Sequence, residues 1–100
     1  MVEKLFVYGT LQEAEVQQAV LGRIAELRED ILHDFKKGDV EINGTIYPIA
    51  IPAVGSQIVG KVLEASPEEI AMMDEYETAA YQRIMIVLES GDDSWVYCQP

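Results

Sequence analysis

The stretch Leu5-Phe6-Val7-Tyr8-Gly9-Thr10-Leu11 decides how the fold begins. Its first four residues form a nearly continuous apolar run that stops at a glycine, which is typical of a strand buried on both faces. We therefore predict a strand over residues 3–8. Thr10 is a suitable N-cap for a short helix over residues 12–21, which contain neither Gly nor Pro and precede Gly22.

The middle of the chain carries one clear turn signal and two ambiguous segments. Residues 24–35 mix helical and alternating apolar spacing, so the sequence leaves them open between helix and strand. Asn43-Gly44 between β-branched residues predicts a hairpin over residues 40–47, because both turn positions favour positive φ. Pro48 and Pro52 interrupt ladder hydrogen bonding, which predicts an irregular extended loop or edge segment around residues 49–51.

The second half of the chain contains the best-marked helix. Residues 57–65 alternate as a strand, and Gly60 within them indicates a bulge or a close backbone approach. Ser66-Pro67-Glu68-Glu69 is a capping box that begins a helix running to about residue 76. Residues 81–89 and 95–98 then pair as a closing hairpin. This order predicts one α+β domain over residues 1–100, with a small mixed, barrel-like β-sheet and about two short helices.

Composition and charge limit the possible partners. One hundred residues, 49% of them hydrophobic, suffice for one core. The 18 acidic residues outweigh 7 basic ones and leave a net charge of −11. Nucleic acid and anionic membrane surfaces are therefore disfavoured as partners, since clustered Lys and Arg bind both. A neutral or zwitterionic small molecule is easier to accommodate than a strongly anionic one.

Cysteine and histidine are too rare for several kinds of site. Cys98 and His33 are each the only residue of their type, which excludes an internal disulfide, a thiolate zinc cluster and a two-histidine metal site within one chain. We interpret His33 as a surface residue. No segment reaches the roughly 20 apolar residues of a membrane span, and the first residues predict a strand rather than a signal peptide. We expect a cytoplasmic protein.

Two segments can carry chemistry. The turn after the first strand leaves backbone N–H groups free, and such a turn can bind a carboxylate or an oxyanion. Glu77 follows Tyr76 near the end of the second helix. If it points inward, desolvation raises its pKa and suits it to acid and base catalysis. The alternative is an exposed acidic last turn in which Arg83 neutralises a carboxylate.

Three stretches together resemble the γ-glutamylcyclotransferase-like family, which includes the γ-glutamylamine cyclotransferases and the plant avirulence-induced proteins. They are the Tyr-Gly-Thr-Leu turn, the Pro- and Gly-containing residues 47–62, and Met-Asp-x-x-Glu-x-x-x-Tyr-x-Arg at residues 73–83. The resemblance covers nearly the whole chain. It implies a small barrel-like α+β fold with a cavity over the turn that follows the first strand.

The resemblance also implies an activity and a set of site residues. Active members convert a γ-glutamyl compound into 5-oxoproline and a free amine, without metal or cofactor. Glu77 matches the catalytic glutamate of these enzymes. The candidate substrate-binding residues are Tyr8, Gly9, Thr10, Leu11, Tyr81, Arg83 and Tyr97.

The sequence leaves two functions open. One is a cyclotransferase that acts on γ-glutamyl amines or peptides, and the other is a non-catalytic small-molecule-binding or interaction domain with the same fold. A buried Glu77 that faces a cavity favours the enzyme, whereas exposure or a salt bridge to Arg83 favours the binding domain. The stretch Gln12-Glu13-Ala14-Glu15 is acidic and would repel substrates with extra carboxylates, such as glutathione. The sequence determines neither the particular substrate nor the oligomeric state.

Overall fold

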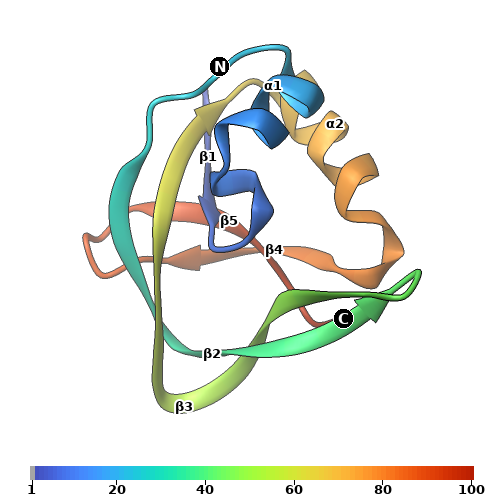
Figure 1. Cartoon of the computed structure of the whole chain (residues 1–100). Helices are drawn as coiled ribbons and strands as arrows, with labels where there is room; N and C mark the ends of the chain where they lie inside the picture. The colour runs from blue at the N-terminus through green and yellow to red at the C-terminus, as the bar shows by residue number, and fades with distance from the viewer. Residues whose placement is uncertain (1) are drawn as a thin grey trace.

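Five strands form one curled, mixed sheet in the computed structural model, which describes residues 2–100 (Figure 1). The strands are β1 (Glu3–Val7), β2 (Arg28–Ile42), β3 (Thr45–Ala65), β4 (Gln82–Val87) and β5 (Asp93–Cys98). The helices are η1 (Thr10–Gln12), α1 (Ala14–Leu21), α2 (Pro67–Glu77) and η2 (Thr78–Ala80), of which η1 and η2 are 3-10 helices. The predicted α+β class is confirmed.

The strand order is β2-β3-β1-β5-β4. Neighbouring strands run antiparallel except β1 and β5, which are parallel. A further parallel pairing joins β3 to β5, with Ala50 opposite Cys98. Because this contact links strands that are not neighbours in the sheet order, it curls the sheet into a half-barrel. Both α-helices lie on one side of the curled sheet (Figure 1).

β1 is the buried centre of this architecture. Leu5 and Val7 pack in a cluster with Met73 of α2, while Phe6 and Tyr8 belong to a second cluster on the other face. Burial on both faces accounts for the continuous apolar run in the sequence. The predicted strand is confirmed, with its end at Val7, and Tyr8 beyond it is still buried.

β2 and β3 form a long antiparallel hairpin that resolves the ambiguous segments. The turn at Asn43-Gly44 has positive φ at both residues, 51° and 82°, as the predicted hairpin requires. Residues 24–35 are not helical, since β2 begins at Arg28. Of the two alternatives for residues 49–51, an irregular loop is wrong and an extended edge segment is confirmed, since Pro48 and Pro52 pair in register with β2. Proline is tolerated there because, on the edge away from β2, β3 pairs only at Ala50 with β5 and through residues 61–65 with β1, so neither proline has a partner on that edge.

Gly60 provides the predicted close approach. A Cβ atom at this position would lie 2.6 Å from the backbone oxygen of Val7 and 2.6 Å from Cζ of Phe6. No larger residue fits without a shift of β1 against β3. The bulge lies elsewhere, at Asp34 in β2, where φ is 65° and the register with β3 shifts.

The two α-helices begin differently from each other. The capping box of α2 is confirmed, because Ser66 Oγ accepts from the Glu69 N–H at 3.2 Å and Glu69 Oε1 accepts from the Ser66 N–H at 3.0 Å. The predicted cap of α1 by Thr10 is wrong. A 3-10 turn intervenes, α1 starts only at Ala14, and its N-cap is Glu13 without a side-chain bond.

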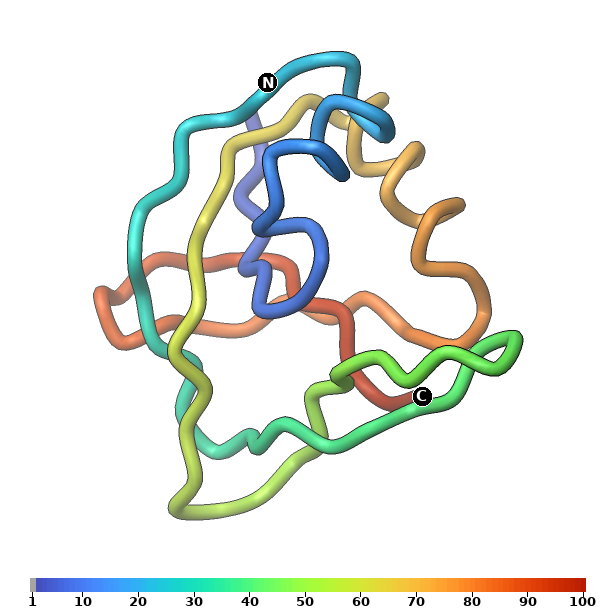
Figure 2. Tube along the Cα trace, viewed as in Figure 1, coloured from blue at the N-terminus to red at the C-terminus, as the bar shows by residue number. Residues whose placement is uncertain are grey.

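The ends of several elements meet at one place. The chain trace shows the tip of the β2–β3 hairpin reaching toward the end of α2 (Figure 2). Within residues 2–100, no helix is long and apolar enough to cross a membrane.

Candidate active site

A cavity of about 690 Å³, including the part open to solvent, lies where β1, α2 and the β2–β3 hairpin meet. Its walls are Phe6, Val7, Tyr8, Gly9, Thr10, Leu11, Ile42, Tyr47, Pro48, Tyr76, Glu77, Thr78, Tyr81 and Tyr97. All five tyrosines of the chain are among them. Within residues 2–100, Glu77 is the only wall residue with a carboxyl, and no wall residue is a lysine or an arginine.

The turn after β1 borders this cavity, and its first backbone N–H groups have no acceptor within the turn. A 3-10 turn follows Gly9, in which the Gln12 N–H donates to the Gly9 oxygen at 3.1 Å. Among residues 2–100, the N–H groups of Gly9, Thr10 and Leu11 donate to no acceptor in this turn, as expected at the start of a helix. A Cβ on Gly9 would lie 3.1 Å from Pro48 Cγ, so glycine lets β3 approach the turn closely.

The Gln17 side chain of α1 holds the same turn by a hydrogen bond to its backbone. Its Nε2 donates to the Leu11 oxygen at 2.8 Å, and its Oε1 accepts from the Ala25 N–H at 2.9 Å. The side chain is 1% exposed, and a buried amide is stable only when both of its ends are bonded. Gln17 was not predictable as a site residue, because the sequence of an amphipathic helix does not indicate that a glutamine side chain is buried.

Glu77 is the last residue of α2 and is partly buried. No ion pair within residues 2–100 involves it, and Arg83 pairs elsewhere. Burial raises the pKa of the Glu77 carboxyl to about 7. The next residue, Thr78, has φ 62° and ψ −171°. Such angles are almost confined to glycine and cost about 1–3 kcal/mol, a strain that is common at functional sites.

Four cavity tyrosines have hydroxyls that are hydrogen-bonded to the protein, and three of them, Tyr8, Tyr81 and Tyr97, also have a raised pKa. The Tyr97 hydroxyl donates to Asp74 Oδ1 at 2.7 Å. Tyr8 accepts from the Ala50 N–H at 2.9 Å and donates to the backbone oxygen of Tyr97. Tyr81 donates to the Pro48 oxygen at 2.8 Å, and burial raises its pKa to about 12. Burial also raises the pKa values of Tyr8 and Tyr97. All three hydroxyls are therefore neutral at pH 7.

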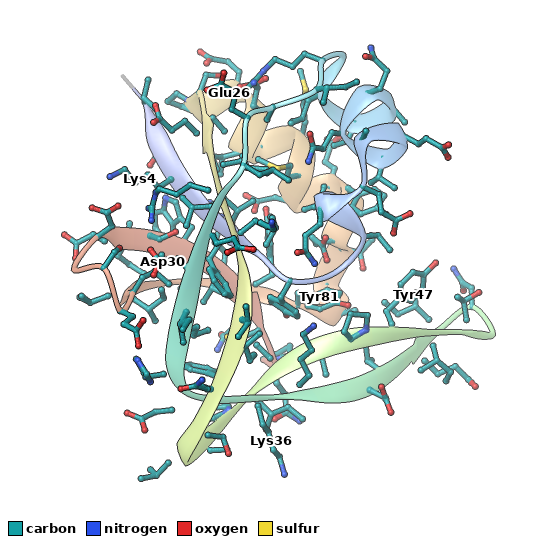
Figure 3. The ribbon with its side chains drawn as sticks, turned by 60° about the vertical axis from the view of Figure 1, so that its left-hand side comes forward. Lys4, Glu26, Asp30, Lys36, Tyr47 and Tyr81 are labelled. Atoms are coloured by element: carbon teal, nitrogen blue, oxygen red, sulfur yellow. The ribbon has the colours of Figure 1, made fainter. Side chains whose placement is uncertain are left out.

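The remaining two tyrosines come from α2 and from the β2–β3 hairpin. Tyr76 and Thr10 share a hydrogen bond of 2.8 Å that joins α2 to η1. Tyr47 belongs to the hairpin, and both Tyr47 and Tyr81 lie on the side of the hairpin that faces the helices (Figure 3). We did not select Tyr47, Tyr76 or Pro48 as site residues from the sequence, because their place in the wall depends on how the hairpin curls.

Arg83 differs from the other predicted site residues. The turn residues, Glu77, Tyr81 and Tyr97 all border the cavity, whereas Arg83 does not. Its guanidinium pairs with the carboxylate of Asp74 at 2.8 and 3.0 Å and lies 4.1 Å from the centre of the Trp95 ring. Arg83 was a candidate for either substrate contact or a structural role, and the ion pair with Asp74 is of the structural kind.

This arrangement can bind an anionic group and move a proton. Free turn amides stabilise a carboxylate or a developing oxyanion. A carboxyl with a pKa of about 7 is present in both protonation states near neutral pH, which suits a group that alternates between base and acid.

The fold is a small α+β domain. Among the described residues, its cavity is bordered by one carboxyl, that of Glu77, and by the turn after β1 with its unbonded backbone N–H groups. Residues 5–100 match the model of the family described as "Gamma-glutamyl cyclotransferase, AIG2-like". The chain belongs to this family, as the resemblance of its motifs had indicated.

Relatives of known sequence and known structure agree with this assignment. AIG2-like protein D of Arabidopsis thaliana is 33% identical over 95 residues, which cover 92% of this chain and 61% of that protein. AIG2-like protein C of the same plant is 34% identical over 91 residues, which cover 90% and 52%. The chain therefore spans between about half and three fifths of the length of these relatives.

A solved structure titled "Gamma-glutamyl cyclotransferase" has the same fold. Its TM-score is 0.77 at 16% identity, with 100% of this chain and 68% of that chain covered. The solution structure of an Arabidopsis thaliana protein gives a TM-score of 0.84 at 24% identity and covers 98% and 68%. At these identities the likeness concerns the fold.

Proposed function

We propose that this protein is a cyclotransferase that converts a γ-glutamyl amine or γ-glutamyl peptide into 5-oxoproline and a free amine. Glu77 is its general base and then its general acid. The observation that carries the proposal is the Glu77 carboxyl itself, which is partly buried, faces the cavity and is unpaired within residues 2–100. Membership of the cyclotransferase family supports the reaction class.

The proposed reaction needs one proton shuttle. The α-ammonium group of the substrate loses a proton to the Glu77 carboxylate, and the resulting amine attacks the γ-carbonyl carbon. The new C–N bond closes a five-membered ring, and the bond from this carbon to the departing nitrogen breaks. The protonated Glu77 gives its proton to that nitrogen, and the regenerated carboxylate then carries the second proton of the ring nitrogen to the released amine. The products are 5-oxoproline and the amine in its ammonium form.

The turn and the cavity walls perform the remaining tasks. Because the attack is intramolecular, holding the substrate in its folded conformation supplies much of the rate enhancement. The free N–H groups of Gly9, Thr10 and Leu11 bind charged oxygens of the γ-glutamyl group or of the intermediate. The tyrosines of the wall surround the bound substrate, and among the described wall residues Glu77 is the one that brings a carboxyl to it.

The alternative of a non-catalytic binding domain is less well supported. A salt bridge between Glu77 and Arg83 would have favoured it, but Arg83 pairs with Asp74. The charge near the site also bears on the substrate. Glu13 and Glu15 are exposed beside the turn, and no lysine or arginine borders the cavity within the described residues. We therefore propose γ-glutamyl amines as better substrates than glutathione, which carries a second carboxylate.

The experiment measures 5-oxoproline release from γ-glutamyl amines, γ-glutamyl dipeptides and glutathione. Wild-type protein is compared with Glu77→Gln and with Glu75→Gln, which removes an exposed acidic residue of the same helix end. We expect Glu77→Gln to lose at least about 100-fold in turnover, as is usual when a general acid and base is removed, and Glu75→Gln to retain activity. Folded wild-type protein that binds γ-glutamyl compounds without converting any of them would instead identify a binding domain.

A further inference from the structure

Asp74 lies three residues before Glu77, close to the end of α2, and its carboxylate gathers several donors. Oδ1 accepts from the Tyr97 hydroxyl at 2.7 Å and from Arg83 Nε at 2.8 Å, while Oδ2 accepts from Arg83 Nη2 at 3.0 Å. This two-point contact holds the guanidinium in one orientation, and the Trp95 ring supports its face at 4.1 Å.

Arg83 is held only one side chain away from the cavity. Tyr97 separates the two, because its ring borders the cavity and its hydroxyl bonds Asp74. The charges of Arg83 and of Glu77 both act on the Tyr97 hydroxyl, the first lowering and the second raising its pKa. Asp74 and Glu77 are three positions apart in α2, so their side chains are neighbours on one face of the helix. The guanidinium that Asp74 binds is therefore held next to the position of Glu77, and Arg83 has a long, flexible side chain.

Within residues 2–100, Glu77 has no cationic partner. The titratable groups that face it across the cavity come from the turn after β1, the β2–β3 hairpin, α2, the segment after η2 and β5, and all of them are tyrosines. They are Tyr8, Tyr47, Tyr76, Tyr81 and Tyr97. A guanidinium that entered this cavity would therefore find one carboxylate and no competing anion among the described wall residues.

We propose that Asp74 is a positioning residue that keeps Arg83 away from Glu77, so that the Glu77 carboxyl stays unpaired. Paired with a guanidinium, a carboxyl typically has a pKa lower by about 1 to 3. Glu77 would then remain ionised, become a weaker base and lack the proton that the departing amine needs. The catalytic consequence rests on the proposed function, whereas the effect on Glu77 titration does not.

The test is a titration of ¹³C-labelled glutamate side chains by NMR, in which Glu77→Gln identifies the Glu77 signal. We expect a midpoint of about 7 in the wild type and a midpoint lower by about 1 or more in Asp74→Asn. The double variant Asp74→Asn/Arg83→Gln should return to the wild-type midpoint, because no guanidinium remains. Glu75→Gln is the matched control, which removes an exposed acid without releasing Arg83.

A purely structural role for Asp74 gives different results. It predicts that the double variant is at least as perturbed as Asp74→Asn, and this result would overturn the proposal, as would an unchanged midpoint in Asp74→Asn. If Asp74→Asn does not fold, Arg83→Lys decides: lysine keeps the charge but cannot form the two-point contact. We expect it to lower the Glu77 midpoint, and an unchanged midpoint would again refute the proposal.

Enzyme activity separates this inference from the proposed function. The acidic limb of the pH–rate profile should move to lower pH in Asp74→Asn and return in the double variant. If the wild type releases no 5-oxoproline, the proposed function fails, while the NMR midpoints still decide whether Asp74 restrains Arg83.

Discussion

Burial of Glu77 should make the protein less stable at high pH, and Glu77→Gln should remove that loss. The pKa of the carboxyl is about 7 in the folded protein and near its ordinary value of 4.5 in the unfolded chain. The folded state therefore binds more protons than the unfolded state between these values. Stability contributed by this group falls as pH rises from about 4.5 through about 7 and stays low above that range.

The size of the effect follows from the two pKa values. Their difference of about 2.5 corresponds to about 3 kcal/mol at pH 8, where both states have largely lost the proton. At pH 5 the same relation gives less than about 1 kcal/mol. Because Glu77 is only partly buried, these are upper values. We expect Glu77→Gln to gain about 1–2 kcal/mol on the wild type between pH 5 and pH 8.

Urea denaturation at pH 5, 6, 7 and 8 measures this difference directly. The quantity of interest is the free energy of unfolding of Glu77→Gln minus that of the wild type, in which the titration of all other acidic residues cancels. Glu75→Gln, an exposed acid, serves as the control and should give a nearly flat difference. A flat difference for Glu77→Gln would show that Glu77 titrates as an ordinary exposed carboxyl, and the reasoning about the site would be refuted.

Two further predictions concern stability. Gly60→Ala should cost about 1–3 kcal/mol, because the new methyl group meets the backbone oxygen of Val7 at 2.6 Å. In the control Gly38→Ala, the closest contact of the new methyl group is the movable end of the Ile51 side chain, at 2.3 Å, so the loss should be smaller. Equal losses of unfolding free energy in urea denaturation would contradict this. Ser66→Ala should cost about 1 kcal/mol through loss of the α2 cap, and thermal melting without a fall in Tm would refute it.

Features that depend on neighbouring residues were predictable from the sequence. The capping box at Ser66 and the hairpin turn at Asn43-Gly44 satisfy backbone groups a few positions away, so their residue types reveal them. The buried β1 was evident from its apolar run. Gly60 was identified as a close approach, although only the structure shows that β1 is the strand it meets.

Features that depend on distant partners were not predictable. Residues 28–35 become a strand because they pair with residues 52–62 of β3. Their own apolar spacing is compatible with both helix and strand. Likewise, nothing local indicates that Gln17 turns inward to hold the Leu11 oxygen. The position of Glu77 was expected from a motif, but the choice of Asp74 as the partner of Arg83 is a property of the assembled structure.

The two ends of α2 differ in how favourable their local interactions are. At its start, Ser66 and Glu69 cap each other, and Arg23 binds Glu69 at 2.8 Å. At its end, Glu77 is buried against a helix dipole that disfavours its charge, and Thr78 has a strained backbone. The capping box stabilises α2 as a whole and so offsets part of these costs, and the helix extends through Glu77.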